Sequence, residues 1–255
     1  LWNQHLDRYL REDLGFEQSP TDPCLYLKGS AERSHIFGSS AEKQARENKK
    51  GPFIALLAYV DDCCITGDSP AAIDALVEKI KTDFQDKLDD MGELHHFLGM
   101  EITRDRTRKI LDVNINNYIL DVLERFSMQD AKGKRTPLPV NGLSTKRDCP
   151  DPNSDKGRTE IEAMKLREYR GLIGALLWIS RTCVPSIAYS VHHLSMFSNN
   201  PGEKHWKQAQ HVLRHLKYHV DNNDPSVYVS PLGLRFNLKE DRSLHGYVDA
   251  SFADD

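Results

Sequence analysis

The sequence has no uninterrupted apolar stretch long enough to cross a bilayer, and no charged segment followed by an apolar one opens it. From these absences we expect a soluble protein rather than an integral membrane protein or one with a secretory leader. Cysteine is scarce: the five residues are odd in number and lack metal-ligand spacing, which favours a reducing intracellular setting over a disulfide framework.

The sequence also lacks an excess of basic charge. Lys and Arg total 34 against 38 Asp and Glu, giving a net charge of -4, so any contact with nucleic acid must come from local basic patches. The 255 residues are enough for a sizeable core and predict two modules rather than one. The first residue is Leu rather than Met, so we expect a fragment of a longer chain.

One stretch organises the remainder of the chain. Eight apolar residues, Phe53 to Val60, run into Asp61 and Asp62, and a second short apolar run follows from Cys63 to Ile65. An apolar run of this length that ends at acids indicates a strand buried on both faces. The simplest geometry is a β-hairpin that reverses at the two aspartates and holds both carboxylates on a rigid edge.

The aspartate pair has two readings from the residues alone. Asp is common in turns because it bonds to its own backbone, so the pair can be structural. Alternatively, two like charges flanked by apolar residues repel each other unless a cation lies between them. Carboxylates of this kind suit Mg²⁺, which would make Asp61 and Asp62 the protein half of a two-metal site for phosphoryl or nucleotidyl transfer.

Tyr59, Val60, Asp61 and Asp62 resemble the YxDD box of reverse transcriptases, and their surroundings resemble the polymerase of copia-type LTR retrotransposons. The resemblance implies that Asp61 is a metal ligand and that Asp62 lies beside it near the primer terminus. Other segments share the likeness, namely the W-x-x-x-L pattern from Trp2, Leu14–Phe16, Asp22–Tyr26 and Tyr169–Gly174.

A second segment resembles the primer grip of the same family. We expect Phe97 to Thr103 to be one strand, residues 104–108 a turn, and Lys109 to Ile115 the returning strand. By resemblance, the hairpin backbone approaches the primer and Gly99 leaves room for it. The resemblance thus implies nucleic-acid contacts by Tyr59, Phe97, Leu98 and Gly99, whereas composition alone indicates only a hairpin.

The predicted fold class is α+β: a partial reverse-transcriptase palm with an antiparallel sheet and helices, a helical thumb and connection, and truncated RNase H-like strands. Apolar spacing and cap residues predict helices over 1–14, 70–86, 117–126, and three more around 169–177, 185–194 and 201–220. Short strands are expected at 24–27, 227–229, 232–238 and 244–248.

The predicted domains follow composition and resemblance together. Residues 1–127 are assigned to palm and thumb with a polar insertion at 28–52, 128–160 to a linker, 161–222 to a helical connection, and 223–255 to the beginning of an RNase H-like domain. In that last segment, Asp249 matches the family's first metal-binding carboxylate.

The helix expected after Pro201 carries His211, His215 and His219 at intervals of four. Such a row could hold a transition metal. Without a carboxylate or a fourth ligand, a mildly basic surface is the stronger reading, and it would include nearby cations: Lys204, Lys207, Arg214 and Lys217. Lys132, Lys134 and Arg135 form either a phosphate patch or a solvated charge run.

The resemblance implies RNA-directed DNA synthesis with Mg²⁺, and its partners are an RNA template, a DNA primer, dNTP and the remainder of a Pol polyprotein. It implies a cytoplasmic location, in a virus-like particle, or a nuclear one, and no membrane contact. In the family a third carboxylate lies on an earlier strand, upstream of this chain, so we expect the chain alone to be inactive. The alternative is a non-catalytic remnant, decayed or repurposed, that binds nucleic acid or protein.

Overall fold

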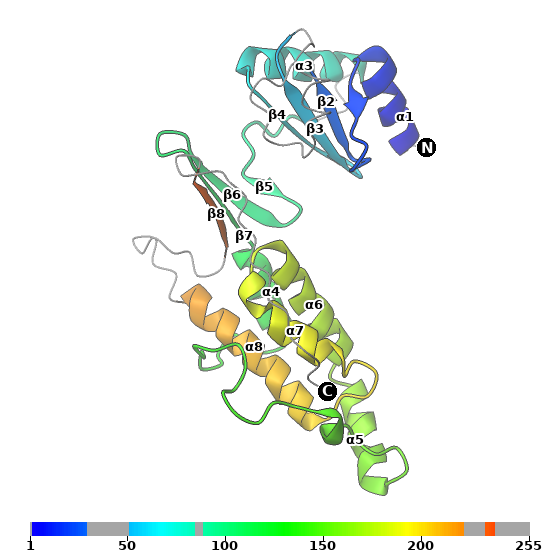
Figure 1. Ribbon diagram of the computed structural model, residues 1–255, viewed down its shortest axis with the longest axis vertical. Helices are drawn as coiled ribbons and strands as arrows, with labels where there is room; N and C mark the ends of the chain where they lie inside the picture. Colours follow the sequence, from blue (N-terminus) through cyan, green and yellow to red (C-terminus); the bar gives the residue numbers. More distant parts are fainter. Residues whose placement is uncertain (1, 30–50, 85–88, 222–232, 238–255) are drawn as a thin grey trace, which may run out of the picture. The chain divides into compact units, whose positions relative to one another are not determined.

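A computed structural model describes residues 2–29, 51–84, 89–221 and 233–237 (Figure 1). The chain forms two compact units, which divide between Leu94 and His95. The polar insertion predicted at 28–52 falls largely outside the described residues. Among the described residues, no helix is long and apolar enough to cross a membrane.

The first unit is an antiparallel sheet with helices on one face. Strand order follows the sequence, β1-β2-β3-β4. The strands are β1 (Glu17–Gln18), β2 (Leu25–Lys28), β3 (Ile54–Tyr59) and β4 (Asp62–Gly67). The helices are α1 (Trp2–Arg8), which continues as a π-helical turn over Tyr9–Asp13, and α3 (Pro70–Asp83).

Strand β3 is buried on both faces, as its continuous apolar run predicted. Its Ile54, Leu56 and Ala58 join a core formed with α1 and α3, whereas Ala55 packs on the other face in a small cluster with Leu27 and Phe53. The helix ends also follow the sequence. The Ser69 hydroxyl accepts a hydrogen bond from the Ala72 amide at the start of α3, and Gly15, at a φ of +68°, follows the first helix.

The second unit contains another antiparallel sheet, with the order β5-β6-β7-β8. Its strands are β5 (His96–Phe97), β6 (Met100–Asp105), β7 (Ile110–Asn114) and β8 (Leu234–Asn237). The single strand predicted over Phe97 to Thr103 is wrong. Leu98 and Gly99 both have positive φ values, and Phe97 pairs with Met100, so the chain reverses there in a two-residue turn.

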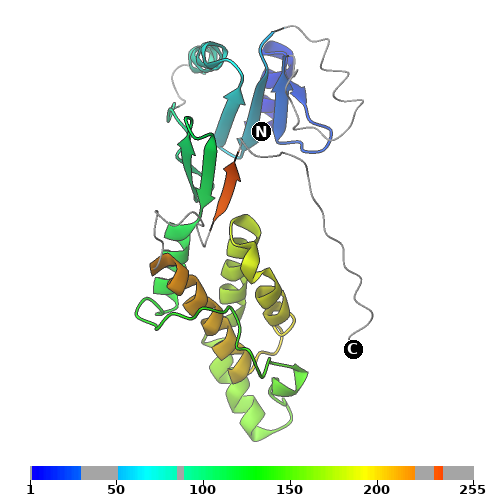
Figure 2. The same cartoon turned by 60° about the vertical axis from the view of Figure 1, so that its left-hand side comes forward.

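Strand β8 pairs antiparallel with β7, so Leu234 lies opposite Val113 (Figure 2). It falls within the strand predicted over 232–238, but it extends the sheet of β5 to β7. The other predicted C-terminal strands and Asp249 lie outside the described residues. Arg235 of β8 makes two hydrogen bonds to the Asp112 carboxylate, at 2.6 and 2.8 Å.

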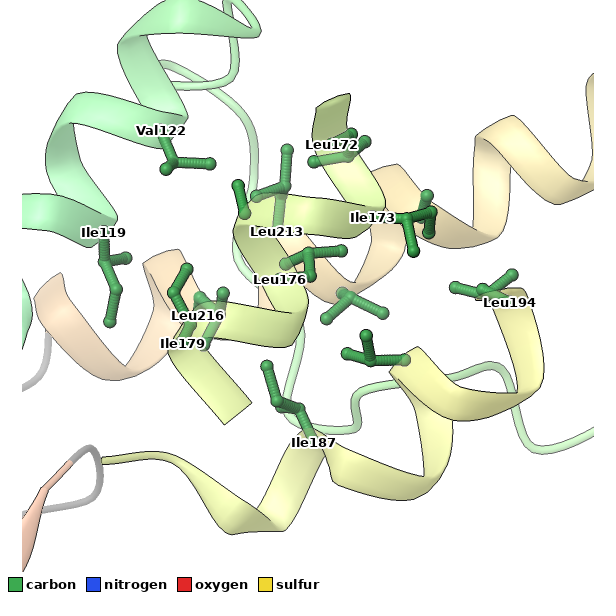
Figure 3. Packing of buried hydrophobic residues seen from close by; sticks show 14 of the residues in the cluster. Ile119, Val122, Leu172, Ile173, Leu176, Ile179, Ile187, Leu194, Leu213 and Leu216 are labelled. Carbon is green, nitrogen blue, oxygen red and sulfur yellow. The ribbon is translucent and has the colours of Figure 1, made fainter. Parts of the chain in front are cut away.

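Helices form the main core of the second unit (Figure 3). Three of them, α6, α7 and α8, correspond to the three predicted after residue 160. Leu172, Leu176, Ile179, Leu194 and Leu213 are fully buried between them. The helices are α4 (Asn116–Arg125), α5 (Asp155–Lys165), α6 (Tyr169–Thr182), a 3₁₀ turn over Pro185–Ile187, α7 (Ala188–Ser195) and α8 (Glu203–Asp221).

The segment predicted as a linker packs on this unit. In Figure 1 the green trace between α4 and α5 runs alongside α8. Met128, Leu138 and Ser144 are buried, and a 3₁₀ turn over Lys146–Asp148 carries a capping box with Thr145. The assignment of residues to palm, thumb, linker and connection stays a prediction.

Candidate functional site

The two aspartates of the YxDD box lie at the tip of the β3–β4 hairpin. Tyr59 pairs with Asp62, so Val60 and Asp61 are the two residues of the turn. Asp61 and Asp62 are both exposed, and neither carboxylate has a hydrogen-bond or ion-pair partner among the described residues. The predicted hairpin is present, but the chain reverses at Val60 and Asp61, one residue earlier than the predicted reversal at the two aspartates.

Strand alternation puts Asp62 on the face of the sheet away from the helices. Ile54, Leu56 and Ala58 face α1 and α3, so Tyr59, the next residue along the strand, faces the opposite way. Asp62 pairs with Tyr59 and shares its face. The Tyr59 side chain is 51% exposed. The Tyr59 ring and the Asp62 carboxylate thus lie on the same face of the sheet, the one opposite α1 and α3.

The turn itself holds Val60 in an unusual backbone conformation. Its φ is +54°, in the left-handed region where a β-branched residue is an outlier. The indole Nε1 of Trp2 donates a hydrogen bond of 3.0 Å to the Val60 carbonyl oxygen, across 58 residues of sequence. The sequence predicted a helix over residues 1–14 that includes Trp2, but helical periodicity does not reveal this contact.

The donor set suits a hard divalent cation. Carboxylate oxygens are what Mg²⁺ takes from proteins, usually one or two together with substrate phosphates. Cys64 shares the Asp62 face, but burial raises the pKa of its thiol, so no thiolate is added there. No group of three or more His, Cys, Asp or Glu residues able to hold a metal occurs in the described part of the chain.

Asp7, an acid near the start of the chain, has structural partners instead. The Tyr26 hydroxyl donates to Asp7 at 3.0 Å, and Arg11 pairs with the same carboxylate. Burial, reinforced by the bond to Asp7, raises the pKa of Tyr26 to about 12. The Tyr9 hydroxyl donates to Asp83 at 2.6 Å and joins α1 to the end of α3.

The proposed primer-grip residues lie in the second unit, at the β5–β6 turn. Phe97 and Leu98 are half-buried and Gly99 is exposed. A Cβ added at Gly99 would meet nothing within 4 Å, so within this chain its φ of +76°, rather than crowding, is what calls for glycine. Asp61 and Asp62 belong to the first unit.

Two histidines of the α8 row, His211 and His215, contact the segment that follows α4. His215 is 5% exposed, and its Nδ1 lies 3.2 Å from the Lys134 carbonyl oxygen, while His211 Nε2 lies 3.0 Å from that of Thr136. Desolvation lowers the pKa of His211, His215 and His219. The lowered pKa values favour neutral rings at pH 7, and His211 and His215 anchor the segment that follows α4.

The chain is similar in sequence to known reverse transcriptases. Residues 41–140 match the family model described as reverse transcriptase (RNA-dependent DNA polymerase), a range that includes Asp61, Asp62 and the β5–β6 turn. The whole chain is 31% identical to 16% of the retrovirus-related Pol polyprotein from transposon TNT 1-94 of Nicotiana tabacum. No solved structure matches it.

Two similar proteins from Arabidopsis thaliana are also retrovirus-related Pol polyproteins. The retrovirus-related Pol polyprotein from transposon RE1 is 32% identical over 94% of this chain and 15% of its own length. That from transposon RE2 is 31% identical over 79% of this chain and 12% of its own length. The chain belongs to the copia-type reverse-transcriptase family of retrotransposon Pol polyproteins, and it spans about a sixth of the relatives with the widest coverage.

Proposed function

We propose that this chain supplies the metal-binding hairpin of an RNA-directed DNA polymerase, with Asp61 and Asp62 as the carboxylates that hold Mg²⁺. The carrying observation is the position of the pair: both side chains are exposed at the tip of a strand in which Ile54, Ala55, Leu56 and Ala58 are buried. Packing of the strand holds the hairpin tip in position, while the carboxylates of Asp61 and Asp62 stay open to solvent. The family match covers this hairpin.

The proposed reaction is attack of a primer 3′ hydroxyl on the α-phosphate of a dNTP, directed by an RNA template. Bound Mg²⁺ would lower the pKa of the attacking hydroxyl and stabilise charge on the reacting phosphate and the leaving group. In this proposal Asp61 and Asp62 fix the position of the metal, and Tyr59 lies on the same face as Asp62, where its ring can contact the nucleic acid.

The turn of Phe97, Leu98 and Gly99 is proposed to contact the primer backbone. Support comes from its geometry: two residues with positive φ make a tight turn whose Gly99 is exposed. The same proposal takes residues 1–127 as palm and thumb, 161–222 as connection, and 223–255 as the beginning of RNase H with Asp249 as a metal ligand. It places the chain within a larger Pol polyprotein, in a cytoplasmic particle or the nucleus.

Polymerisation is proposed to need a carboxylate from another segment of the polyprotein. Two carboxylates from one hairpin leave a two-metal site incomplete, and the described residues gather no third acid beside them. We therefore expect the chain on its own to be inactive.

Primer extension tests this proposal. The chain is incubated with Mg²⁺, dNTP and a DNA primer annealed to RNA, beside its Asp61→Asn variant. We expect no extension by either protein. Robust synthesis that Asp61→Asn abolishes would confirm the metal site and contradict the inactivity, whereas synthesis that survives the substitution would contradict the assignment of Asp61.

A second candidate function is non-catalytic binding by a decayed or repurposed element. The observation that favours it is a groove in the second unit, remote in sequence from the aspartate pair. Its lining includes the cations Lys132, Lys204, Lys207 and Arg214. Nucleic-acid binding that is unchanged in Asp61→Asn, together with absence of metal at the hairpin, would support this function over the first.

A further inference from the structure

Four Ser or Thr residues of the chain are followed directly by proline. Proline-directed protein kinases phosphorylate a hydroxyl group in this position, because the next residue then brings no amide hydrogen into the kinase site. The sequence alone does not rank the four pairs, which are Ser19-Pro20, Ser69-Pro70, Thr136-Pro137 and Ser230-Pro231. Ser230 and Pro231 lie outside the described residues, and the structure distinguishes the other three pairs.

The two serines of the first unit already use their hydroxyl groups. Ser19 is 5% exposed, and its Oγ lies 3.0 Å from Oγ1 of Thr21. Ser69 caps α3: its Oγ accepts a hydrogen bond from the Ala72 amide, and Pro70 is the first residue of the helix. One hydroxyl is therefore buried, and the other is held at a helix start where the following backbone is helical.

Thr136 is placed differently. It is exposed, belongs to no helix or strand, and its hydroxyl makes no hydrogen bond within the described part of the chain. Proline at the next position disfavours helical backbone at Thr136 and favours an extended one. His211 Nε2 lies 3.0 Å from the Thr136 carbonyl oxygen, and Leu138 is buried. The main chain is therefore anchored, while the Thr136 side chain stays open to solvent.

The segment around Thr136 carries only positive charge. No acidic residue occurs between Asp130 and Asp148, whereas five cations do: Lys132, Lys134, Arg135, Lys146 and Arg147. Lys134 and Arg135, directly before Thr136, are both exposed. A phosphothreonine carries a charge of about −1.5 to −2 at pH 7 and three acceptor oxygens, which arginine can pair in a bidentate way. The neighbouring charges therefore stabilise a phosphate group at this position.

We propose that Thr136 is a phosphorylation site for a proline-directed protein kinase. Oγ1 of Thr136 attacks the γ-phosphorus of ATP and forms a new P–O bond. The bond from that phosphorus to the oxygen bridging the β- and γ-phosphates breaks, ADP leaves, and the hydroxyl proton passes to a base of the kinase. The phosphate then pairs with Arg135 and Lys134. The site lies in the second unit and does not depend on the metal site proposed at Asp61 and Asp62.

The test incubates the folded full chain with ATP and a cyclin-dependent kinase, and mass spectrometry of its peptides locates the phosphate. We expect faster phosphorylation of Thr136 than of Ser19 or Ser69. Pro137→Ala keeps the acceptor hydroxyl and removes the directing proline, so the Thr136 phosphate should be lost. The matched control is Ser69→Ala, which removes a hydroxyl next to proline in α3 and should leave phosphorylation of Thr136 unchanged.

A titration followed by ³¹P NMR tests the pairing of the phosphate. Nearby cations lower its second pKa, which is about 6 without them. We expect a lower value in the folded chain, and Arg135→Gln should move it back toward the ordinary one. A value that Arg135→Gln leaves unchanged would contradict the pairing.

Three results would overturn the phosphorylation site itself. One is faster phosphorylation of Ser19 or Ser69 than of Thr136. Another is a Thr136 phosphate that persists in Pro137→Ala. The third is a folded chain that stays unmodified at Thr136 while a peptide of residues 130–142 is phosphorylated, because the packing of the segment would then exclude the kinase.

Discussion

The indole nitrogen of Trp2 donates to the carbonyl oxygen of Val60 and thereby fastens the first helix to the tip that carries Asp61 and Asp62. The same indole ring meets Phe84 edge-on, with centroids 5.7 Å apart, at the end of α3. Trp2 thus links the turn at Val60 to the first helix and to the end of α3, which are distant from each other in sequence. The position of the aspartate pair depends on these contacts as well as on its own strand.

Substituting Trp2→Phe removes the donor and keeps an aromatic ring against Phe84. A hydrogen bond of this kind contributes about 0.5 to 1.5 kcal/mol, and the partial exposure of Trp2 favours the lower end. We expect faster amide hydrogen exchange at Tyr59 and Asp62. Exchange in β6 and β7 serves as the internal control and should not change. Unaltered exchange at the hairpin would show that the indole does not support the turn.

The left-handed backbone of Val60 predicts that Val60→Gly stabilises the first unit. A β-branched residue in the left-handed region is strained by about 1 to 2 kcal/mol. Glycine removes this strain, but it also raises the entropy of the unfolded chain, which offsets part of the gain in stability. We expect a net gain of up to about 1 kcal/mol in urea unfolding. Ala58→Gly, in the adjoining strand β3 where φ is not positive, should destabilise the unit. Loss of stability in Val60→Gly as well would mean that the turn is not strained.

Leu176 is fully buried at the centre of the helical core in Figure 3. Truncation to alanine removes its transfer free energy and leaves a cavity, so Leu176→Ala should destabilise the second unit by about 2 to 5 kcal/mol. Leu166, which is 86% exposed, provides the control, and Leu166→Ala should change stability by less than about 0.5 kcal/mol. Similar losses for both variants in urea unfolding would contradict the observed core.

The desolvated histidines of the second unit predict that it loses stability in mild acid. Desolvation lowers the pKa of His205, His211 and His215, and the charges of Lys134 and Arg214 add to the effect at His211. The unfolded chain, with ordinary pKa values near 6.5, therefore binds protons first as the pH falls. Stability should be fully present above about pH 7 and should decline below about 6.5.

Urea unfolding at a series of pH values measures this dependence. His215→Gln should weaken it, because one of the shifted groups is gone. His5→Gln, in the first unit, should leave the dependence of the second unit as it was. Stability of the second unit that is constant between about pH 7.5 and 5.5 would show that these rings are not desolvated.

Local signals in the sequence predicted most elements of the fold. The apolar run before Asp61 predicted a strand buried on both faces, and Ser69-Pro70 predicted the start of α3. The turn at Leu98 and Gly99 was missed because a leucine rarely adopts positive φ, so the segment reads as a continuous strand. Its two-residue reversal is decided by backbone geometry that composition does not show.

Contacts between distant segments could not be predicted from the sequence. The Trp2–Val60 bond and the packing of residues 128–144 on α8 depend on tertiary placement, whereas polar and Pro-rich composition indicated a linker. Likewise, His215 reads as a surface residue in a charged helix until the segment above it is placed. At the candidate site, the sequence predicted the hairpin that carries the two aspartates, but not the contact that holds their turn.

The central claim is that Asp61 and Asp62 bind a divalent cation, and Mn²⁺ broadening of NMR signals tests it most directly. Mn²⁺ is titrated into the ¹⁵N-labelled chain in the presence of a primer–template and dNTP, beside the variants Asp61→Asn and Asp62→Asn. The account predicts selective loss of amide signals from Tyr59 to Cys63, which each substitution weakens. Broadening confined to other segments, or hairpin broadening that both substitutions leave intact, would contradict it.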